Sequence, residues 1–420
     1  MRNNGQIARR GEQPRKYRFL FVAAMILGKN TALQNLRSAI SAMPEVEATW
    51  VTIGTKPEDI IARAPLVSRN HSLMFGLVAR TRVRALLRAG NEYDAAFFNH
   101  ILPAVFLRHF RRTVPCVDSM DTTPIGLLRH GQPYYTKLRS EGASVVRGFK
   151  NRLARSIFTD AAFLLPYSQF TRDSLLHDYQ IPDRKIVVVA PGVSLTMWPG
   201  RSPDSLAGVS RTAPVRVLFV GGDFLRKGGD LLLQVARRDE FRKHEFHFVT
   251  SGLPGGRQDN VVFHDGVTAN SGGMLDLYRS ADIFAMPTRA DFSPTNAICE
   301  AMAMELPVIA TGVGGLDEIV VDGQTGFIVR TNDADDIADR LRSLIDDPGR
   351  RLRLGRNARA MVEARFNIET NARVIVDCLK RAADAKAASI LRPTRGVHGN
   401  ALVEEKAGGK PGRHAHRIVS

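Results

Sequence analysis

Residues 286–329, MPTRADFSPTNAICEAMAMELPVIATGVGGLDEIVVDGQTGFIV, are the most informative part of the chain. They place one carboxylate, Glu300, at the mouth of an apolar helix, behind a loop of small residues and ahead of a short strand that ends in Gly-Val-Gly-Gly. A carboxylate can accept hydrogen bonds from two neighbouring ribose hydroxyls, and exposed amides at helix starts and glycine turns bind phosphates. This layout suits the binding of a sugar nucleotide.

A second informative segment lies upstream, at residues 217–237 (VLFVGGDFLRKGGDLLLQVAR). It predicts a strand, a glycine turn, a basic pair and a helix. Free amides at the helix start, together with Arg226 or Lys227, can neutralise a diphosphate. The spacing G-x-x-x-x-G-K-[ST] of nucleotide-triphosphate loops is absent. An ordinary strand-to-helix turn with solvated cations is the alternative interpretation of this segment alone.

Short apolar runs alternate with helical patterns along most of the chain, which is typical of parallel sheets covered by helices on both faces. This alternation of strand and helix patterns is interrupted at residues 199–214, a segment rich in Pro, Gly and Ser, and resumes after it. We therefore expect an α/β fold with two Rossmann-like, doubly wound domains that face each other across a cleft. The predicted strands are residues 18–27, 48–53, 95–98, 114–117 and 163–167 in the first half, and 215–220, 245–250, 260–263, 283–286, 308–310 and 326–329 in the second.

Four segments follow from this organisation. Residues 1–16 form a basic arm without hydrophobic periodicity, and residues 386–420 form a Gly-, Lys- and Arg-rich tail; both are expected to be disordered. Residues 17–205 are expected to form the first Rossmann-like domain, and residues 206–385 the second, which carries both sugar-nucleotide motifs. Ligands of open α/β sheets bind outside the carboxyl ends of the strands, so the chemistry is expected between the two domains.

Composition limits the class of protein. With 420 residues, 44% of them apolar, the chain is long enough for two cores. Its three widely spaced cysteines argue against a disulfide framework and show no metal-ligand spacing, which fits a cytoplasmic protein. No apolar run reaches the 18 residues that a membrane span needs; residues 19–27 follow a basic leader, but a buried first strand explains them better than a signal peptide.

The net charge of +17 is concentrated in the first half. Residues 1–205 hold 29 basic and 15 acidic side chains, whereas residues 206–420 hold 30 and 27. A polybasic face can bind anionic lipid or nucleic acid through phosphates. Peripheral attachment at the inner face of a membrane and a merely basic solvated surface both stay open. No aromatic-basic interleaving or recognition helix supports nucleic acid as a partner.

The two motifs together resemble the donor-binding signature of glycosyltransferase family 4, which consists of retaining enzymes with the GT-B fold. The resemblance covers about residues 18–379 and is strongest at residues 217–329. It implies that Lys227 and a nearby arginine grip the donor diphosphate and stabilise the leaving nucleoside diphosphate. Lys227 matches the family lysine. The family arginine is replaced here by Gly222-Asp223, so Arg226 is its expected substitute.

The family usually has two acids eight positions apart, the first near the transferred sugar and the second on the ribose. Glu300 matches the second acid, but Phe292 stands eight residues before it and Asp291 nine. Either Asp291 reaches the sugar, or loop amides hold it. We expect Lys227 to face Glu300 across the interdomain gap. The further donor-binding residues that the resemblance implies are Gly28, Gly222, Gly266, Ser293, Pro294, Thr295 and Asn296.

The first domain carries weaker signals. Asp121 falls where relatives often show a His-Asp pair, and Met120 occupies the histidine place. Asp121 and His100 are the candidates for catalytic groups on the acceptor side, with a hydrogen-bonded structural role as the alternative for His100.

These features predict a retaining glycosyltransferase that moves a hexose from a nucleoside-diphosphate sugar to an acceptor hydroxyl. The expected acceptor is a carbohydrate or a lipid-linked molecule, in bacterial-type polysaccharide or glycolipid synthesis. No metal and no cofactor besides the donor are expected. The alternative is a protein that binds nucleotide sugars without turnover, which Phe292 and Met120 suggest. The nucleobase, the sugar and the acceptor stay open.

Overall fold

The computed structural model describes most of the chain between residues 15 and 391. The described ranges are 15–26, 29–55, 59–68, 70–129, 144–201, 214–252, 256–292 and 294–391. Gly28, Ser293, the predicted domain boundary at residue 205 and most of the predicted arm and tail lie outside these ranges. Within them, every helix is too short or too polar to cross a membrane.

The first domain is built on a sheet of parallel strands in the order β2-β1-β3-β4-β5. In β1 all side chains from Phe19 to Ala24 are buried, because helices cover both faces of the sheet. All five predicted strands of this half are present, with ends shifted by up to three residues. The strands are β1 (Tyr17–Ala24), β2 (Val46–Ile53), β3 (Ala95–Phe98), β4 (Cys116–Met120) and β5 (Phe163–Pro166).

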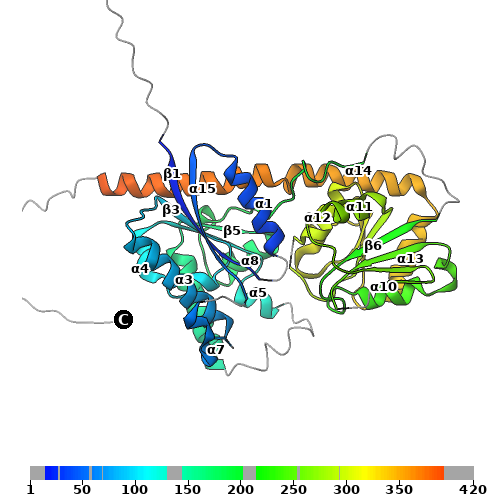
Figure 1. Ribbon diagram of the computed structural model, residues 1–420, viewed down its shortest axis with the longest axis horizontal. Coiled ribbons are helices and arrows are strands. Elements are labelled where there is room, and N and C mark those ends of the chain that lie inside the picture. Colours follow the sequence, from blue (N-terminus) through cyan, green and yellow to red (C-terminus); the bar gives the residue numbers. More distant parts are fainter. Residues whose placement is uncertain are drawn as a thin grey trace, which may run out of the picture.

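Helices flank this sheet on both sides (Figure 1). One apolar cluster joins α1 to one face, and another joins α3, α4 and α7 to the other. Polar side chains fix several helix starts: the Ser168 hydroxyl accepts a hydrogen bond from the Thr171 amide at the start of α8. The helices are α1 (Lys29–Ser41), α2 (Pro65–Ser68), α3 (His71–Arg88), α4 (Arg108–Thr113), α5 (Pro124–Arg129), α7 (Ser144–Asp160) and α8 (Gln169–His177).

The second domain repeats the architecture around a sheet in the order β12-β11-β10-β6-β7-β9-β8. The six strands predicted from the sequence are parallel, and β8 adds an antiparallel edge that was not predicted. The edge strand is three exposed residues without an apolar pattern, so no sequence signal marks it. The strands are β6 (Arg216–Val220), β7 (Glu245–Val249), β8 (Gly256–Gln258), β9 (Val261–His264), β10 (Ile283–Met286), β11 (Val308–Thr311) and β12 (Gly326–Val329).

Within the described residues, helices α10 to α14 surround this second sheet. Asp347 and Pro348 begin α14, where the Asp347 carboxylate accepts a hydrogen bond from the Arg350 amide. The helices are α10 (Gly229–Ala236), α11 (Gly272–Ser280), α12 (Asn296–Ala303), α13 (Ala334–Ile345) and α14 (Pro348–Arg365).

The last helix, α15 (Ile368–Leu391), returns to the first domain (Figure 1). Its apolar face, which includes Ile375 and Leu379, packs against Phe19 and Phe97 of the first sheet. The predicted range 206–385 for the second domain therefore includes a helix that belongs to the first core. The predicted tail also begins too early, because the helix continues past residue 386 to Leu391.

The chain crosses between the domains twice, and the two crossings lie side by side. Val193 of the first crossing makes two backbone hydrogen bonds to the second: its amide donates to the Phe366 carbonyl (2.9 Å), and its carbonyl accepts from the Ile368 amide (3.1 Å). A Cβ atom on Gly192 would lie 2.6 Å from the Ile368 nitrogen, so only glycine allows this approach. These paired crossings form a narrow connection about which the domains can move.

Polar contacts also join the domains away from the crossings. The Glu318 carboxylate accepts hydrogen bonds from the Gln169 and Phe170 amides at the start of α8, both 2.8 Å long. The Asn270 side chain donates to Asn35 of α1 at 3.1 Å. The carboxyl ends of the two sheets consequently face one another.

Candidate active site

A cavity of about 950 Å³ lies between the two domains. The loops that line it follow β4 and β5 in the first domain and β6 and β10 in the second. This is the edge at which open parallel sheets bind ligands. The cavity brings together most of the candidate residues: Asp121, Gly222, Arg226, Lys227, Asp291, Pro294, Thr295, Asn296 and Glu300.

The basic loop after β6 is held in place by the loop after β10. The Arg226 carbonyl accepts hydrogen bonds from the Arg289 amide (2.8 Å) and the Thr288 hydroxyl (3.1 Å). Gly228 has φ of 78°, and a Cβ atom there would lie 2.1 Å from the Pro287 carbonyl oxygen. Only glycine fits this position, and it lets α10 begin directly behind the basic pair.

Both cations of the loop contact Asp291. Lys227 Nζ donates to Asp291 Oδ2, and an Arg226 Nη atom lies 3.7 Å from Asp291 Oδ1. Arg226 also donates to Asp223 (3.1 Å) and to the Ala290 carbonyl (2.7 Å). The two cations that the sequence assigns to a diphosphate are thus paired with the acidic side chains of Asp223 and Asp291.

Gly314 positions the backbone of Asp291. A Cβ atom on Gly314, which has φ of 60°, would lie 1.9 Å from the Asp291 carbonyl oxygen. The glycine pair after β11 therefore lets the segment that contains Asp291 approach closely, which is a structural role. Phe292, at the place of the usual family acid, lines the cavity as well.

Glu300 lies in the second turn of α12 rather than at its mouth, and it is buried. Burial raises the pKa of Glu300 to about 7, and a hydrogen bond from the Tyr278 hydroxyl opposes that rise. The Tyr278 oxygen lies 3.0 Å from Glu300 Oε2 and 3.2 Å from the Ala297 carbonyl. The carboxyl group is therefore oriented before any ligand binds.

Lys227 and Glu300 line the same cavity, but the expectation that they face each other across the interdomain gap is wrong. Both come from the second domain, from the loop before α10 and from α12. The Thr295 hydroxyl beside them is buried and has no hydrogen-bond partner among the described residues. A ligand in the cavity can supply one.

Two candidates do not line the cavity. His100 Nδ1 accepts a hydrogen bond from the Leu102 amide (3.1 Å) at the start of a short helical turn, which is the structural alternative considered for it. Gly266 is an exposed turn residue with φ of 70°, and its amide donates to its neighbour Asp265 (2.8 Å).

The first domain contributes Asp121 and Tyr167 to the wall of the cavity. The Asp121 carbonyl accepts a hydrogen bond from the Thr171 hydroxyl (2.6 Å), and its carboxylate accepts one from the Thr122 amide (3.0 Å). These contacts hold Asp121 at the end of β4, opposite the basic loop.

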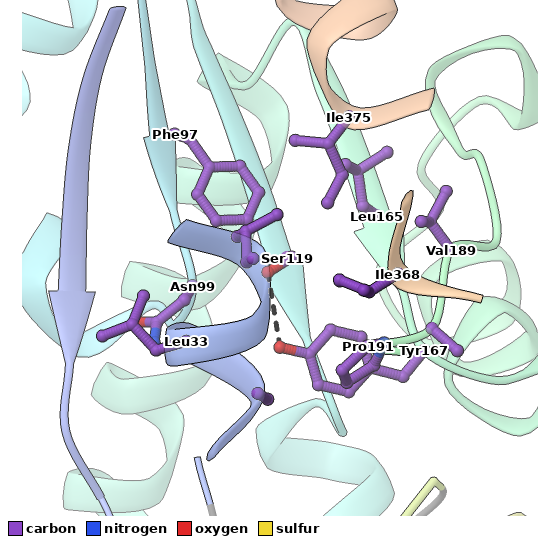
Figure 2. A pocket seen from close by; sticks show the side chains of 13 residues that line it. Leu33, Phe97, Asn99, Ser119, Leu165, Tyr167, Val189, Pro191, Ile368 and Ile375 are labelled. Atoms are coloured by element: carbon purple, nitrogen blue, oxygen red, sulfur yellow. Dashed lines mark hydrogen bonds between the residues drawn. The ribbon is translucent and has the colours of Figure 1, made fainter. Parts of the chain in front are cut away.

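A second, mainly apolar cavity of about 40 Å³ lies behind Tyr167 (Figure 2). In Figure 2 the Tyr167 hydroxyl points toward Ser119. The two hydroxyl oxygens lie 3.5 Å apart, and Phe97, Leu165 and Ile368 also line this cavity. Such a volume accommodates about one water molecule or a methyl group. Tyr167 lines both cavities, so the small cavity leaves space next to a side chain that forms part of the wall of the large one.

The sequence gives no signal for some residues that line the cavity or lie behind its wall. Tyr278 has the spacing of a core residue on α11, and only the fold shows that its hydroxyl reaches Glu300. Thr31 and Ala32, at the start of α1, line the cavity because the two domains lie close together there. Among the described residues, no group of three His, Cys, Asp or Glu side chains is arranged to hold a metal ion.

Comparisons with known proteins identify the second domain. Residues 214–347 match the family model described as glycosyl transferases group 1. The matched residues coincide with the part of the chain where the resemblance in the sequence is strongest. It is 30% identical over 234 residues to D-inositol 3-phosphate glycosyltransferase of Kribbella flavida (50% of this chain, 54% of the relative). With the Arthrobacter sp. protein of the same name it shares 29% over 291 residues (64% and 66%). The chain thus spans between about half and two thirds of these relatives.

The similarity to solved structures extends over both domains. Sucrose-phosphate synthase from Thermosynechococcus elongatus has a TM-score of 0.68 at 19% identity and covers 88% of this chain and 100% of its own. Anabaena Alr3699/HepE in complex with UDP has a TM-score of 0.62 at 16% identity, covering 87% and 100%. The fold is therefore GT-B, as predicted.

Proposed function

We propose that this protein is a retaining glycosyltransferase that moves a hexose from a nucleoside-diphosphate sugar to an acceptor hydroxyl. The observation that carries this proposal is the shared cavity: a cationic loop and a buried carboxyl group of one domain lie opposite polar groups of the other. Lys227 and Glu300 line this cavity from separate segments, the loop before α10 and helix α12. The diphosphate and the ribose of a single ligand would require two such separate contacts. Relatives with glycosyltransferase names support the same activity.

In this proposal Arg226 and Lys227 bind the diphosphate together with the first amides of α10. Fixed cations and helix-start amides stabilise the charge that develops on the leaving nucleoside diphosphate. Such preorganised groups typically lower a barrier by about 3–4 kcal/mol each. Glu300 accepts hydrogen bonds from the ribose hydroxyls, and Tyr278 keeps its carboxyl group oriented.

Retention is proposed to follow from attack on the face that the leaving group vacates. The acceptor hydroxyl then approaches from the first domain, and its proton passes to the departing phosphate oxygen. Asp121 lies on this wall and is proposed to orient the acceptor. Closure of the domains would exclude water and limit hydrolysis of the donor.

The acceptor is proposed to be a carbohydrate or a lipid-linked molecule at the inner face of a membrane. The basic first half of the chain supports this, and so does α7, where the exposed Phe149 has Arg147, Lys150 and Arg152 as near neighbours in the helix. An exposed aromatic side chain among cations is favourable at an anionic lipid surface. Sedimentation with vesicles that contain or lack anionic lipid tests this part separately.

The activity is tested by incubating the purified protein with uridine, guanosine and adenosine diphosphate sugars and following release of the nucleoside diphosphate. We expect release from one of these donors, and product with the anomeric configuration of the donor. The variant Lys227→Met should lose this activity while keeping the fold. Tight binding of a donor without release would instead support a protein that only binds nucleotide sugars.

A further inference from the structure

We propose that Asp291 is an internal counter-ion that makes the site favour the intact nucleotide sugar over the nucleoside-diphosphate product. This inference rests on the proposed function, because it assigns the diphosphate to Arg226 and Lys227. It goes further in naming a residue that sets the order of affinities for substrate and product. The inference is based on the contacts of the Asp291 carboxylate with both Arg226 and Lys227.

The cluster is shielded from solvent and balanced in charge. The side chains of Arg226, Lys227 and Asp291 are only 18%, 14% and 15% exposed, and that of Asp223 is 41% exposed. These four side chains carry two positive and two negative charges. Partial burial strengthens each charge–charge interaction relative to water. A diphosphate that enters this cluster must therefore replace the carboxylates as partner of the cations.

Asp291 cannot simply move away from the site when that exchange occurs. Its carbonyl lies against Gly314, and the neighbouring Ala290 carbonyl is bonded to Arg226, so the backbone of the loop is fixed. The released carboxylate stays at the wall of the cavity, next to the diphosphate. An anion in this place repels the phosphates unless a hydrogen-bond donor lies between them.

The transferred sugar supplies such a donor and the product does not. A hydroxyl of a neutral hexose next to the diphosphate can donate to the Asp291 carboxylate and so offset the lost ion pair. After transfer, the nucleoside diphosphate has no hydroxyl at this position. Asp291 then competes for Lys227 and Arg226, which weakens product binding and favours product release.

The test compares wild type with Asp291→Asn, in which size is kept and the negative charge is removed. Calorimetry with inorganic pyrophosphate needs no knowledge of the nucleobase. We expect the variant to bind pyrophosphate about tenfold more tightly, since hydrogen bonds to charged groups contribute enough for such a factor. For the donor identified by the transfer assay, the affinity of the nucleotide sugar relative to its nucleoside diphosphate should fall by about tenfold or more in the variant.

The matched control is Asp230→Asn, which removes an equal charge from an ion pair with Arg289 outside the cavity. This control should bind pyrophosphate within about twofold of wild type. Asp291→Ser, checked by its unfolding midpoint, repeats the measurement in case the asparagine variant is poorly folded. A purely structural role would weaken every ligand alike rather than strengthen one.

Equal or weaker pyrophosphate binding by both Asp291 variants would overturn the inference, even if the wild type transfers sugar. Tighter pyrophosphate binding with an unchanged ratio of sugar to product affinity would also overturn it. If neither wild type nor variant consumes any nucleotide sugar although the variant binds pyrophosphate more tightly, the proposed function fails instead. The two failures are thus distinguishable.

Discussion

The hydroxyl group of Tyr278 lies 3.0 Å from Glu300 Oε2, beneath the cavity that the two domains share. The contact joins α11 to α12 and orients the carboxyl group assigned to the ribose. Because the Tyr278 hydroxyl stabilises the ionised form, it counteracts part of the rise in the pKa of Glu300 that burial causes. The state of this carboxyl group should therefore influence both stability and ligand binding.

We expect Glu300→Gln to stabilise the unliganded protein at pH 8 but not at pH 4.5. Burial raises the pKa of Glu300 from its ordinary value of 4.5 to about 7 in the folded state. The folded protein thus binds more protons than the unfolded chain between these values, and the stability of the wild type falls relative to the variant as pH rises through this window. The shift corresponds to about 3 kcal/mol as an upper estimate. Unfolding midpoints at both pH values measure it; an equal difference at the two would contradict the shift.

Tyr278→Phe should weaken donor binding by about threefold to tenfold near neutral pH, because it removes a hydrogen bond to the ionised carboxylate. The loss should shrink above pH 8, where Glu300 is ionised without help. The Michaelis constant for the donor as a function of pH is the measurement. A loss that stays constant from pH 6 to pH 9 would show that the Tyr278 hydroxyl does not act through the ionisation of Glu300.

Lys227→Met should lower kcat/KM by about 10²–10³, the range for removing one preorganised group that stabilises developing charge. Asp230→Asn serves as control, because its ion pair with Arg289 lies outside the cavity. A loss below about threefold for Lys227→Met would remove this residue from the proposed mechanism.

Gly228→Ala should destabilise the protein far more than Gly266→Ala. Both glycines have positive φ, so each substitution carries a backbone cost of about 1 kcal/mol. A Cβ atom meets the Pro287 carbonyl at 2.1 Å in the first case and nothing within 4 Å in the second. Denaturant unfolding of the two variants measures the difference, which equal losses would disprove.

Glu318→Gln should loosen the contact between the domains. The variant retains one acceptor oxygen, so one of the Gln169 and Phe170 amides loses its charge-assisted partner. We expect a larger radius of gyration in solution scattering without ligand. Glu363→Gln is the control, since Glu363 pairs with Arg359 within the second domain. An unchanged radius for Glu318→Gln would show that the connecting segments alone set the domain arrangement.

Much of the fold follows from the sequence because its strands are short apolar runs between helical patterns. The family resemblance implied that a final helix returns to the first domain, whereas the predicted domain bounds did not include this return. Packing against Phe19 and Phe97 places α15 there. The three-residue strand β8 is held by backbone pairing with β9 and by the ion pair between Arg257 and Glu245, and neither contact produces an apolar pattern in the sequence.

The sequence predicted those site residues whose side-chain chemistry points to a single role, a cation for a diphosphate or a carboxylate for ribose hydroxyls. Lys227 and Glu300 reach the same cavity as the motifs indicated. Contacts between loops distant in sequence were not predictable: the pairing of Asp291 with Lys227 depends on how Gly314 lets one loop approach another. For His100, position at a strand end was misleading, because its ring bonds a local amide.

The most direct test of the central claim is a crystal structure of the protein with the nucleoside diphosphate of the donor identified by the transfer assay. The account predicts the diphosphate within hydrogen-bond distance of Lys227 Nζ and the amides that begin α10, and both ribose hydroxyls at the Glu300 carboxylate. A nucleotide bound elsewhere, or one whose ribose contacts neither Glu300 oxygen, would contradict it.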